Sequence, residues 1–416
     1  MAQTIFIIII AILIFDYLLE RLLDYLNSTY WSNELPKELS GIYNAEKYKK
    51  SQDYQKVNQK FSLLTSSLSF IAMLLMLIFG GFAFVDGFVR QFTTNPILMA
   101  LFFFGIIGFV SDLLSTPFSV YDTFVIEQKF DFNTTTVKTF ILDKIKGWLL
   151  AIVLGGGLLA LFVLIFDFTG SNFWWIAWLV FSGITIFFTM FYSNLIVPLF
   201  NKQTPLEEGE LRNAIEAFAT KTGFKLNNIF VIDGSKRSKK ANAYFTGLGS
   251  KKRIVLYDTL IKDHTTEELV AVLAHEIGHY KRKHTLQGII ISLLETGLML
   301  FVLSRFLGDK NLSLDLAKAL GTNQASFHIG IIVFGMLYSP LSLILGLALK
   351  VLSRKHEYQA DRFAGENYNT DALKDALKKL SVNNLSNLKP HPFYVFFHYS
   401  HPTLLQRLVA LDQIKK

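Results

Sequence analysis

Long apolar segments alternate with polar segments along this chain, and seven of them reach the length of a membrane-spanning helix. A helix needs about 20 mostly apolar residues to cross the hydrocarbon core of a bilayer. The first run has no basic residue before it and no small-residue cleavage site after it, so we expect it to remain as a span. The pattern predicts a multi-pass α-helical membrane protein with seven transmembrane helices, at residues 3–23, 64–86, 96–118, 147–167, 173–198, 286–306 and 328–351.

Basic residues in the connecting loops predict the orientation of these spans, because cytoplasmic loops carry an excess of Lys and Arg. Segments 27–61 and 119–146 carry several lysines each, whereas 87–95 carries Arg90 alone and 168–172 carries no basic residue. This asymmetry predicts an N-terminus outside the cytosol. The two long polar regions, 199–285 and 352–416, then both face the cytosol and can meet there.

The polar region between the fifth and sixth spans has the pattern of a small α/β module. An amphipathic helix is predicted at 206–222, and β-like runs follow at 228–233, 242–248 and 253–260, separated by turn signals. A further helix is predicted to begin at Thr265, where Thr265 and Glu268 have the spacing of a capping box. We therefore divide the chain into spans 1–5 (1–198), an inserted module (199–285), spans 6–7 (286–351) and a C-terminal region (352–416).

Composition supports this division and narrows the chemistry. Hydrophobic residues make up 51% of the 416 residues and charged residues 18%, below the roughly 25% of soluble domains. The net charge is +8, and the basic residues that produce it lie between apolar runs. This placement indicates a lipid bilayer as the partner and not nucleic acid. The chain has no cysteine, so thiolate ligands and a cysteine nucleophile are excluded, and a metal would need His, Asp or Glu.

The predicted helix after Thr265 contains the pattern H-E-x-x-H at His275, Glu276 and His279. Two histidines four residues apart lie on one face of a helix, so both imidazoles can bind the same ion. Glu276, next to the first histidine, can then reach a water on that ion and act as a general base. A chance match of this short pattern is the alternative, and the capped helix argues against it. The pattern predicts one Zn²⁺ per chain.

A third ligand is needed, because a catalytic zinc has three protein ligands and one open position. Glu357 and Asp361 lie four residues apart in another helical segment, so they share a face. One of them can bind the metal while the other accepts the free N–H of a ligating histidine. The alternative is a solvated helix in which Arg354 and Arg362 pair with these carboxylates.

The predicted site lies close to the membrane. His279 precedes the sixth span by about seven residues, and Glu357 follows the seventh by about five, which corresponds to roughly 7–11 Å along a helix. A water-soluble substrate would not need this location, but a membrane-tethered one would. Zinc, a general base and a polarised carbonyl together favour peptide-bond hydrolysis.

The sequence resembles the CAAX prenyl protease type I family, integral-membrane zinc metalloendopeptidases that process prenylated C-terminal CAAX proteins. The match extends well beyond H-E-x-x-H and follows the family's order along the chain. It covers the segments 124–133, 198–206, 237–238, 242–247, 357–361 and 401–407.

This resemblance implies a role for each matching residue. His275, His279 and Glu357 would bind zinc, Glu276 would be the catalytic base, and His401 would stabilise the transition state. Asp361 and Arg407 would lie next to the ligating residues without binding the metal. Arg407 would be a structural or substrate-contacting cation. Asn242 and Ala243 would begin an edge strand with which a lipidated peptide substrate pairs. The resemblance also implies a large chamber enclosed by the spans and open to the zinc.

The chain departs from the family at one place, where Lys239, Lys240 and Ala241 stand in a stretch that often holds a histidine. This affects the expected substrate preference and leaves the zinc chemistry unchanged. An alternative function is a membrane quality-control zinc protease that degrades misfolded or stalled chains, although such enzymes have fewer spans. A non-catalytic scaffold or transporter with a structural zinc is a third possibility, and it would be expected to lack Glu276 or a ligand. The predicted location is the endoplasmic reticulum membrane, or the inner membrane of a bacterium, with the active site on the cytosolic side.

Overall fold

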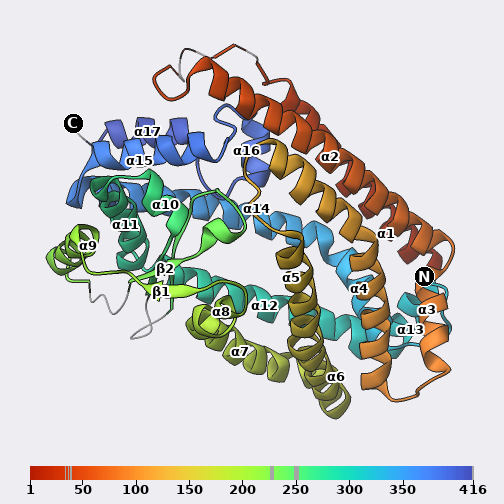
Figure 1. The fold of residues 1–416 in the computed structure, drawn as a ribbon. Coiled ribbons are helices and arrows are strands. Elements are labelled where there is room, and N and C mark those ends of the chain that lie inside the picture. The colour runs from red at the N-terminus through yellow and green to blue at the C-terminus, as the bar shows by residue number, and fades with distance from the viewer. Residues whose placement is uncertain (33, 36, 38–39, 225–228, 248–252, 415–416) are drawn as a thin grey trace.

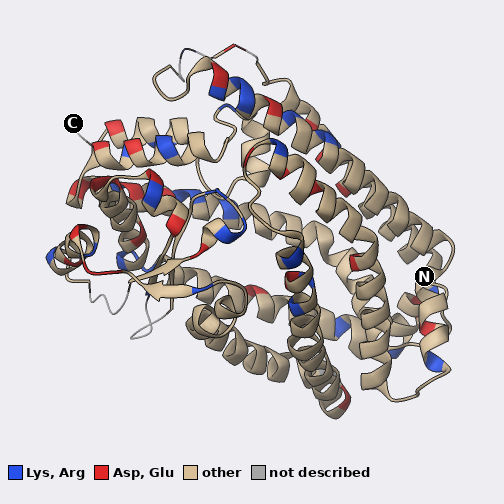
Figure 2. Cartoon of the chain, in the orientation of Figure 1, with Lys and Arg blue, Asp and Glu red and all other residues tan. Residues whose placement is uncertain are grey.

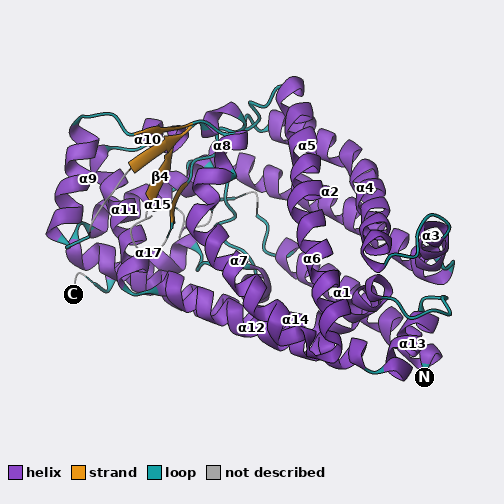
Figure 3. Ribbon diagram, turned by 90° about the horizontal axis from the view of Figure 1, so that it is seen from below, coloured by secondary structure: helices purple, strands orange, loops and turns teal. Residues whose placement is uncertain are grey.

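The structure is a computed structural model that describes residues 1–416 except 33, 36, 38–39, 225–228, 248–252 and 415–416. Long helices form one end of the molecule, and a smaller mixed module lies at the other (Figures 1 and 3). Charged residues are frequent on the module, on the adjoining end of helix α2 and on α5, whereas most of the length of the other long helices is uncharged (Figure 2).

Seven helices in the described part of the chain are long and apolar enough to cross a membrane, which confirms the predicted number. Large apolar side chains on them point outward, for example Ile78 (60% exposed) and Leu294 (63% exposed), as expected of helices that face lipid. The seven are α1 (Ala2–Ser28), α2 (Ala45–Ile78), α4 (Pro96–Tyr121) with a π-helical extension (Asp122–Glu127), α5 (Val137–Leu150) joined through a π-helical turn (Ala151–Gly156) to α6 (Gly157–Thr169), α7 (Phe173–Leu195) with α8 (Val197–Phe200), α12 (His284–Gly308), and α14 (Phe327–Asn367).

One predicted span is interrupted in the structure, and another is part of a longer helix. The predicted span 64–86 contains a break, since α2 ends at Ile78 and α3 (Gly81–Arg90) starts after Gly80. Gly80 has φ +66°, a left-handed conformation that glycine adopts at little cost. Helix α14 contains the predicted seventh span and continues beyond residue 351 to Asn367. The predicted boundary between spans and C-terminal region therefore falls inside one helix, and this helix connects the membrane part directly to the module.

The module is built around a four-stranded sheet with the order β1-β2-β4-β3. Strands β2 and β4 are parallel, whereas β1 and β3 are antiparallel to their neighbours. Helices α9 and α11 pack together beside the sheet, and α11 also packs on α14 and α15. The bounds are β1 (Gln203–Pro205), α9 (Glu210–Lys221), β2 (Ile229–Ile232), β3 (Ala243–Thr246), β4 (Arg253–Tyr257), α10 (Asp258–Asp263) and α11 (Thr266–Lys281).

The structure corrects the predicted elements of this module in three places. The helix predicted from residue 206 begins at Glu210, because the Leu206 amide still donates to the carbonyl of Ile229 in the sheet. The strand predicted to reach residue 260 ends at Tyr257, and the Asp258 carboxylate accepts from the Thr259 amide as α10 begins. Strand β1 was not predicted. The start of the predicted strand 228–233 and the end of 242–248 lie outside the described residues.

Shorter helices close the two ends of the molecule. Helix α13 (Lys310–Ala319) packs with α3 and the start of α1 at the end away from the module. At the module end, α15 (Thr370–Asn383), α16 (Pro392–His398) and α17 (Leu404–Asp412) follow α14. Helix α17 has a capping box, in which Thr403 and Gln406 satisfy each other's backbone amides. Arg407 of α17 lies 3.4 Å from the His275 ring on α11, so this end of the chain packs beside α11.

Candidate active site

Helices α11 and α14 approach each other closely at the H-E-x-x-H segment. The predicted capping box starts α11, since the Glu268 carboxylate accepts from the Thr265 amide at 2.8 Å and the Thr265 hydroxyl accepts from the Glu268 amide at 3.3 Å. Gly278 faces α14, and a Cβ atom placed there would lie 3.1 Å from both the Cα and the carbonyl oxygen of Ala360. A glycine therefore allows these two helices to pack at this distance without a shift of a few tenths of an ångström.

This packing brings together side chains from two distant segments. Ligand atoms of His275, His279 and Glu357 all lie within 4.8 Å of one another. The two Nε2 atoms are 3.1 Å apart, and the Glu357 oxygens lie 3.2 Å from Nε2 of His279 and 3.5 Å from Nε2 of His275. All three side chains face one point.

The geometry and chemistry of this group fit a zinc ion. Donors around a tetrahedral zinc with bonds of about 2.1 Å are about 3.4 Å apart, close to the separations found here. The Oε2 atom of Glu357 is buried and has no hydrogen-bond partner among the described residues. Burial opposes a proton on His275, but the nearby carboxylates of Asp361 and Glu357 raise its pKa to about 9. These carboxylates favour a cation beside the imidazoles, and two imidazoles with a carboxylate are typical zinc ligands.

Asp361 lies on the other side of His275 from Glu357. Its carboxylate accepts from the His275 Nδ1–H at 2.9 Å and from Arg407 at 2.6 and 2.8 Å. Asp361 is 1% exposed, and Arg407 reaches it from α17. Burial works against the charge on Arg407, but Asp361 and then Glu357 raise its pKa. Of the two carboxylates that the sequence leaves open, Glu357 thus faces both Nε2 atoms, and Asp361 orients the ring of His275.

His279 has an equivalent partner that was not predicted from the sequence. Its Nδ1 atom lies 3.0 Å from Nδ1 of His284, and Nε2 of His284 lies 2.8 Å from the side-chain oxygen of Gln359. Since a carbonyl oxygen only accepts, His284 carries its proton on Nε2 and accepts from His279 through Nδ1. Nε2 of His279 is then free of a proton. The imidazole of His356 stacks on His284, with ring centroids 3.9 Å apart.

The spacing of His284 along the chain does not identify it as part of the site. It lies five residues after His279, beyond the end of α11, so helix periodicity alone does not place it beside the site. Lys283 has φ +61°, and this turn between α11 and α12 brings the His284 ring back towards His279.

Glu276 belongs to α11, and His401 belongs to a different segment of the chain. Glu276 follows His275 on α11, is half-buried, and acts electrostatically on Arg407. His401 lies in the loop before α17, with Nε2 3.3 Å from an oxygen of Glu357 and with 62% of its side chain exposed. A cavity of about 410 Å³ with mixed polar and apolar walls is lined by His401, Arg407 and residues of α2, α15 and the loop after α15. His401 and Arg407 thus lie between this cavity and Glu357 or Asp361, which they contact.

Strand β3 lies at the edge of the sheet. In the described residues it pairs only with β4, with Ala243 opposite Leu256. Asn242 comes directly before it, and its side-chain oxygen accepts from the Ala243 amide at 2.8 Å. The strand predicted to begin at Asn242 and Ala243 thus has one unpaired edge, as the addition of a further strand requires.

The segment before β3 is attached to the membrane helices through Lys240. Its ammonium lies 2.8 Å from the Glu127 carboxylate at the end of α4 and 2.9 Å from the hydroxyl of Tyr54 on α2. It also lies 4.5 Å from the ring centroid of Phe132. Lys240 therefore joins the module to two spans, through an ion pair with Glu127 and a hydrogen bond to Tyr54.

The comparisons with known proteins agree on one family. Residues 26–202 match the model of the CAAX prenyl protease N-terminal region with five membrane helices, and residues 205–415 match that of peptidase family M48. CAAX prenyl protease 1 of Saccharomyces cerevisiae is 36% identical over 92% of this chain and 89% of its own. The Dictyostelium discoideum homolog is 35% identical over 98% and 97%.

A solved structure extends this agreement to three dimensions. The crystal structure of Ste24p from S. mikatae superposes with a TM-score of 0.91 at 36% identity, covering 98% of this chain and 99% of that one. The relationship predicted from the sequence motifs is confirmed, and the chain is a multi-pass membrane protein of the CAAX prenyl protease 1 family within peptidase family M48.

Proposed function

We propose that this protein is a zinc-dependent endopeptidase that cleaves prenylated CAAX-type proteins near their C-termini, on the cytosolic side of the endoplasmic reticulum membrane or of a bacterial inner membrane. The observation that carries the proposal is the convergence of His275, His279 and Glu357 beside Glu276. The printed names of the relatives supply the substrate class, since they are CAAX prenyl proteases. Lysines in 27–61 and 119–146 support the orientation.

In this proposal His275, His279 and Glu357 hold the zinc ion. The chemistry that zinc supplies at such a site is a water of lowered pKa and a polarised carbonyl. Glu276 accepts the proton of the attacking water and returns it to the amine of the leaving peptide. His401, which has an exposed ring beside Glu357, donates a hydrogen bond to the carbonyl oxygen as negative charge develops on it.

The remaining residues hold this machinery in place. Asp361 keeps the His275 proton on Nδ1, so that Nε2 faces the metal position. Arg407 neutralises Asp361 and lines the cavity through which a peptide approaches. The free edge of β3, from Asn242 and Ala243 onward, pairs with the extended substrate backbone. We propose that boundaries at residues 198, 285 and 351 separate parts of different function, namely the spans, the inserted module and the C-terminal region that supports the site.

The test is a comparison of purified wild type, Glu276→Gln and Glu357→Gln. We expect Glu276→Gln to keep one zinc per chain by elemental analysis and to lose about 10²- to 10⁴-fold in cleavage of a farnesylated C-terminal peptide. Glu357→Gln is expected to lose zinc as well as activity. Normal cleavage by Glu276→Gln, or a wild-type protein without bound metal, would disprove the mechanism.

A further inference from the structure

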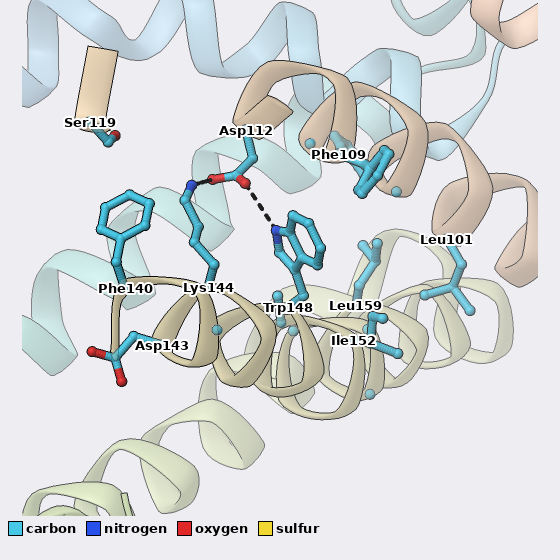
Figure 4. A pocket seen from close by; sticks show the side chains of 18 of the residues that line it. Leu101, Phe109, Asp112, Ser119, Phe140, Asp143, Lys144, Trp148, Ile152 and Leu159 are labelled. Carbon is cyan, nitrogen blue, oxygen red and sulfur yellow. Dashed lines mark hydrogen bonds and ion pairs between the residues drawn. The ribbon is translucent and has the colours of Figure 1, made fainter. Parts of the chain in front are cut away.

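A large cavity lies between helix α4 and the continuous helix formed by α5 and α6, away from the metal ligands. Its volume is about 1350 Å³, which exceeds the roughly 300–1,000 Å³ of most small-molecule sites. Its lining includes Leu101, Phe109, Trp148, Ile152 and Leu159 from these helices (Figure 4). The cavity thus runs along two predicted spans and has largely apolar walls.

The cavity is amphipathic along its length. Leu101 and Leu159 line it where α4 begins and α6 continues, at the end away from the module. Ser119 and Thr123 line it at the opposite end of α4, where Arg237 of the module also contributes. A ligand with a long apolar tail and a polar attachment towards the module would match this arrangement.

The charged groups that line the cavity are already paired. Asp112 accepts from Lys144 at 2.7 Å and from the indole N–H of Trp148 at 2.9 Å (Figure 4). Asp143 accepts from Arg237 at 2.7 and 2.8 Å. Neither cation remains available for a phosphate or another anionic headgroup, because each is matched by a carboxylate. This favours an uncharged hydrocarbon chain over a phospholipid.

Glycines keep the cavity open. Gly105 and Gly108 of α4 and Gly147 of α5 line it, and a Cβ atom at any of the three would meet nothing within 4 Å. Their replacement by larger residues would therefore place side-chain atoms inside the cavity, and leucine favours a helix more than glycine does.

The polar end of the cavity is connected to the peptide-binding strand. Arg237 lines the cavity and also bonds to Asn201 and to the carbonyl of Phe200. Six residues later the chain enters β3 at Ala243. Six residues span at most about 20 Å, so a substrate paired with β3 lies within this distance of Arg237 plus the reach of its own side chains.

We propose that this cavity binds the isoprenoid chain of a prenylated substrate while the peptide pairs with β3. The inference rests on the proposed function, which supplies a substrate with an uncharged chain attached to a peptide. The cavity then acts as a specificity site, since the buried chain adds binding energy that an unmodified peptide lacks.

The test measures binding and does not require catalysis. Gly105→Leu and Gly147→Leu are made singly in the Glu276→Gln protein, in lipid nanodiscs. The probes are one fluorescent C-terminal peptide with a farnesylated cysteine and the same peptide with a free cysteine. We expect each variant to weaken binding of the farnesylated peptide by about tenfold or more and to leave the unmodified peptide unchanged, because an apolar ligand loses burial.

Gly183→Leu on α7 is the matched control, because its Cβ also meets nothing within 4 Å and it does not line the cavity. Zinc content and thermal unfolding show that each variant is folded. Unchanged affinity of the folded cavity variants for the farnesylated peptide would overturn the assignment, as would loss of co-purified phospholipid with no change in peptide binding. A wild-type protein that neither binds nor cleaves either peptide would instead disprove the proposed function.

Discussion

The Nδ1 atom of His284 lies 3.0 Å from the Nδ1 atom of His279, on the side of the ring away from the other ligands. Gln359 fixes the direction of this hydrogen bond, because its oxygen accepts from Nε2 of His284. Asp361 performs the same task for His275 with a carboxylate. The two histidines of one motif are thus oriented by different groups, one charged and one neutral.

Loss of the hydrogen bonds that connect His279 to His284 and His284 to Gln359, which we call the neutral relay, should weaken metal binding. We expect His284→Phe to lower zinc affinity about 10- to 100-fold, as removal of an outer partner of a ligating histidine does. Competition with a zinc chelator measures this directly. Gln359→Leu should give part of the effect, and Gln359→Glu should give less because it keeps an acceptor for His284. Equal zinc affinity in wild type and His284→Phe would argue against the relay.

The close contact at Gly278 predicts a large effect of one methyl group. Gly278→Ala places a Cβ atom 3.1 Å from the backbone of Ala360, so α11 and α14 must separate. We expect a loss of about 1–3 kcal/mol in stability and weaker zinc binding, because Glu357 moves away from the histidines. Thermal unfolding and zinc content measure these effects.

Gly288→Ala on α12 is the control for this substitution, because its Cβ meets nothing within 4 Å. It should be neutral or slightly stabilising, since alanine favours a helix over glycine. If both alanine variants behave alike, the separation of α11 and α14 does not depend on Gly278.

The ion pair of Lys240 with Glu127 should affect substrate binding more than catalysis. Lys240→Met removes the link between the segment before β3 and the spans, so we expect KM for the peptide to rise several-fold with kcat and zinc content nearly unchanged. Lys239→Met is the control, because Lys239 is exposed on the same segment. A fall in kcat without a change in KM would contradict this positioning role.

Stability at low pH should depend on Glu268. Burial opposes its charge, but Lys379 and the Thr265 amide hold its pKa below the ordinary value. A carboxyl group with a lowered folded-state pKa stabilises the protein above its unfolded pKa of about 4.3, and this contribution is lost as pH falls through the folded-state pKa. Glu268→Gln should therefore lower the free energy of unfolding at pH 7 by about 1 kcal/mol, and the melting temperature with it. The substitution should have little effect below the folded-state pKa of Glu268, where the carboxylate is largely protonated.

Melting curves of both proteins in detergent between pH 7 and pH 3 test this prediction, with Glu207→Gln as an exposed control. The difference between wild type and Glu268→Gln should shrink as the pH falls. A difference that stays constant over this range would show that the charge of Glu268 contributes nothing.

Local patterns predicted much of this architecture. The number of spans follows from hydropathy, because a bilayer requires a minimum length of apolar helix whatever the helix packs against. The start of α11 and its capping box follow from Thr265 and Glu268, which interact within one turn. The predicted span 64–86 was misleading because hydropathy does not report backbone conformation. Gly80 adopts a left-handed conformation there and separates α2 from α3.

The sequence by itself determined the spans, the family and the placement of His275 and His279 on one helix face, since these depend on periodicity and on neighbours a few residues apart. Only the tertiary structure decided that Glu357 and not Asp361 faces both Nε2 atoms, and that His284 supports His279. It also created the cavity between α4 and α5–α6. These features arise where separate helices pack, and their geometry depends on close contacts such as that of Gly278 with Ala360, which no local periodicity encodes.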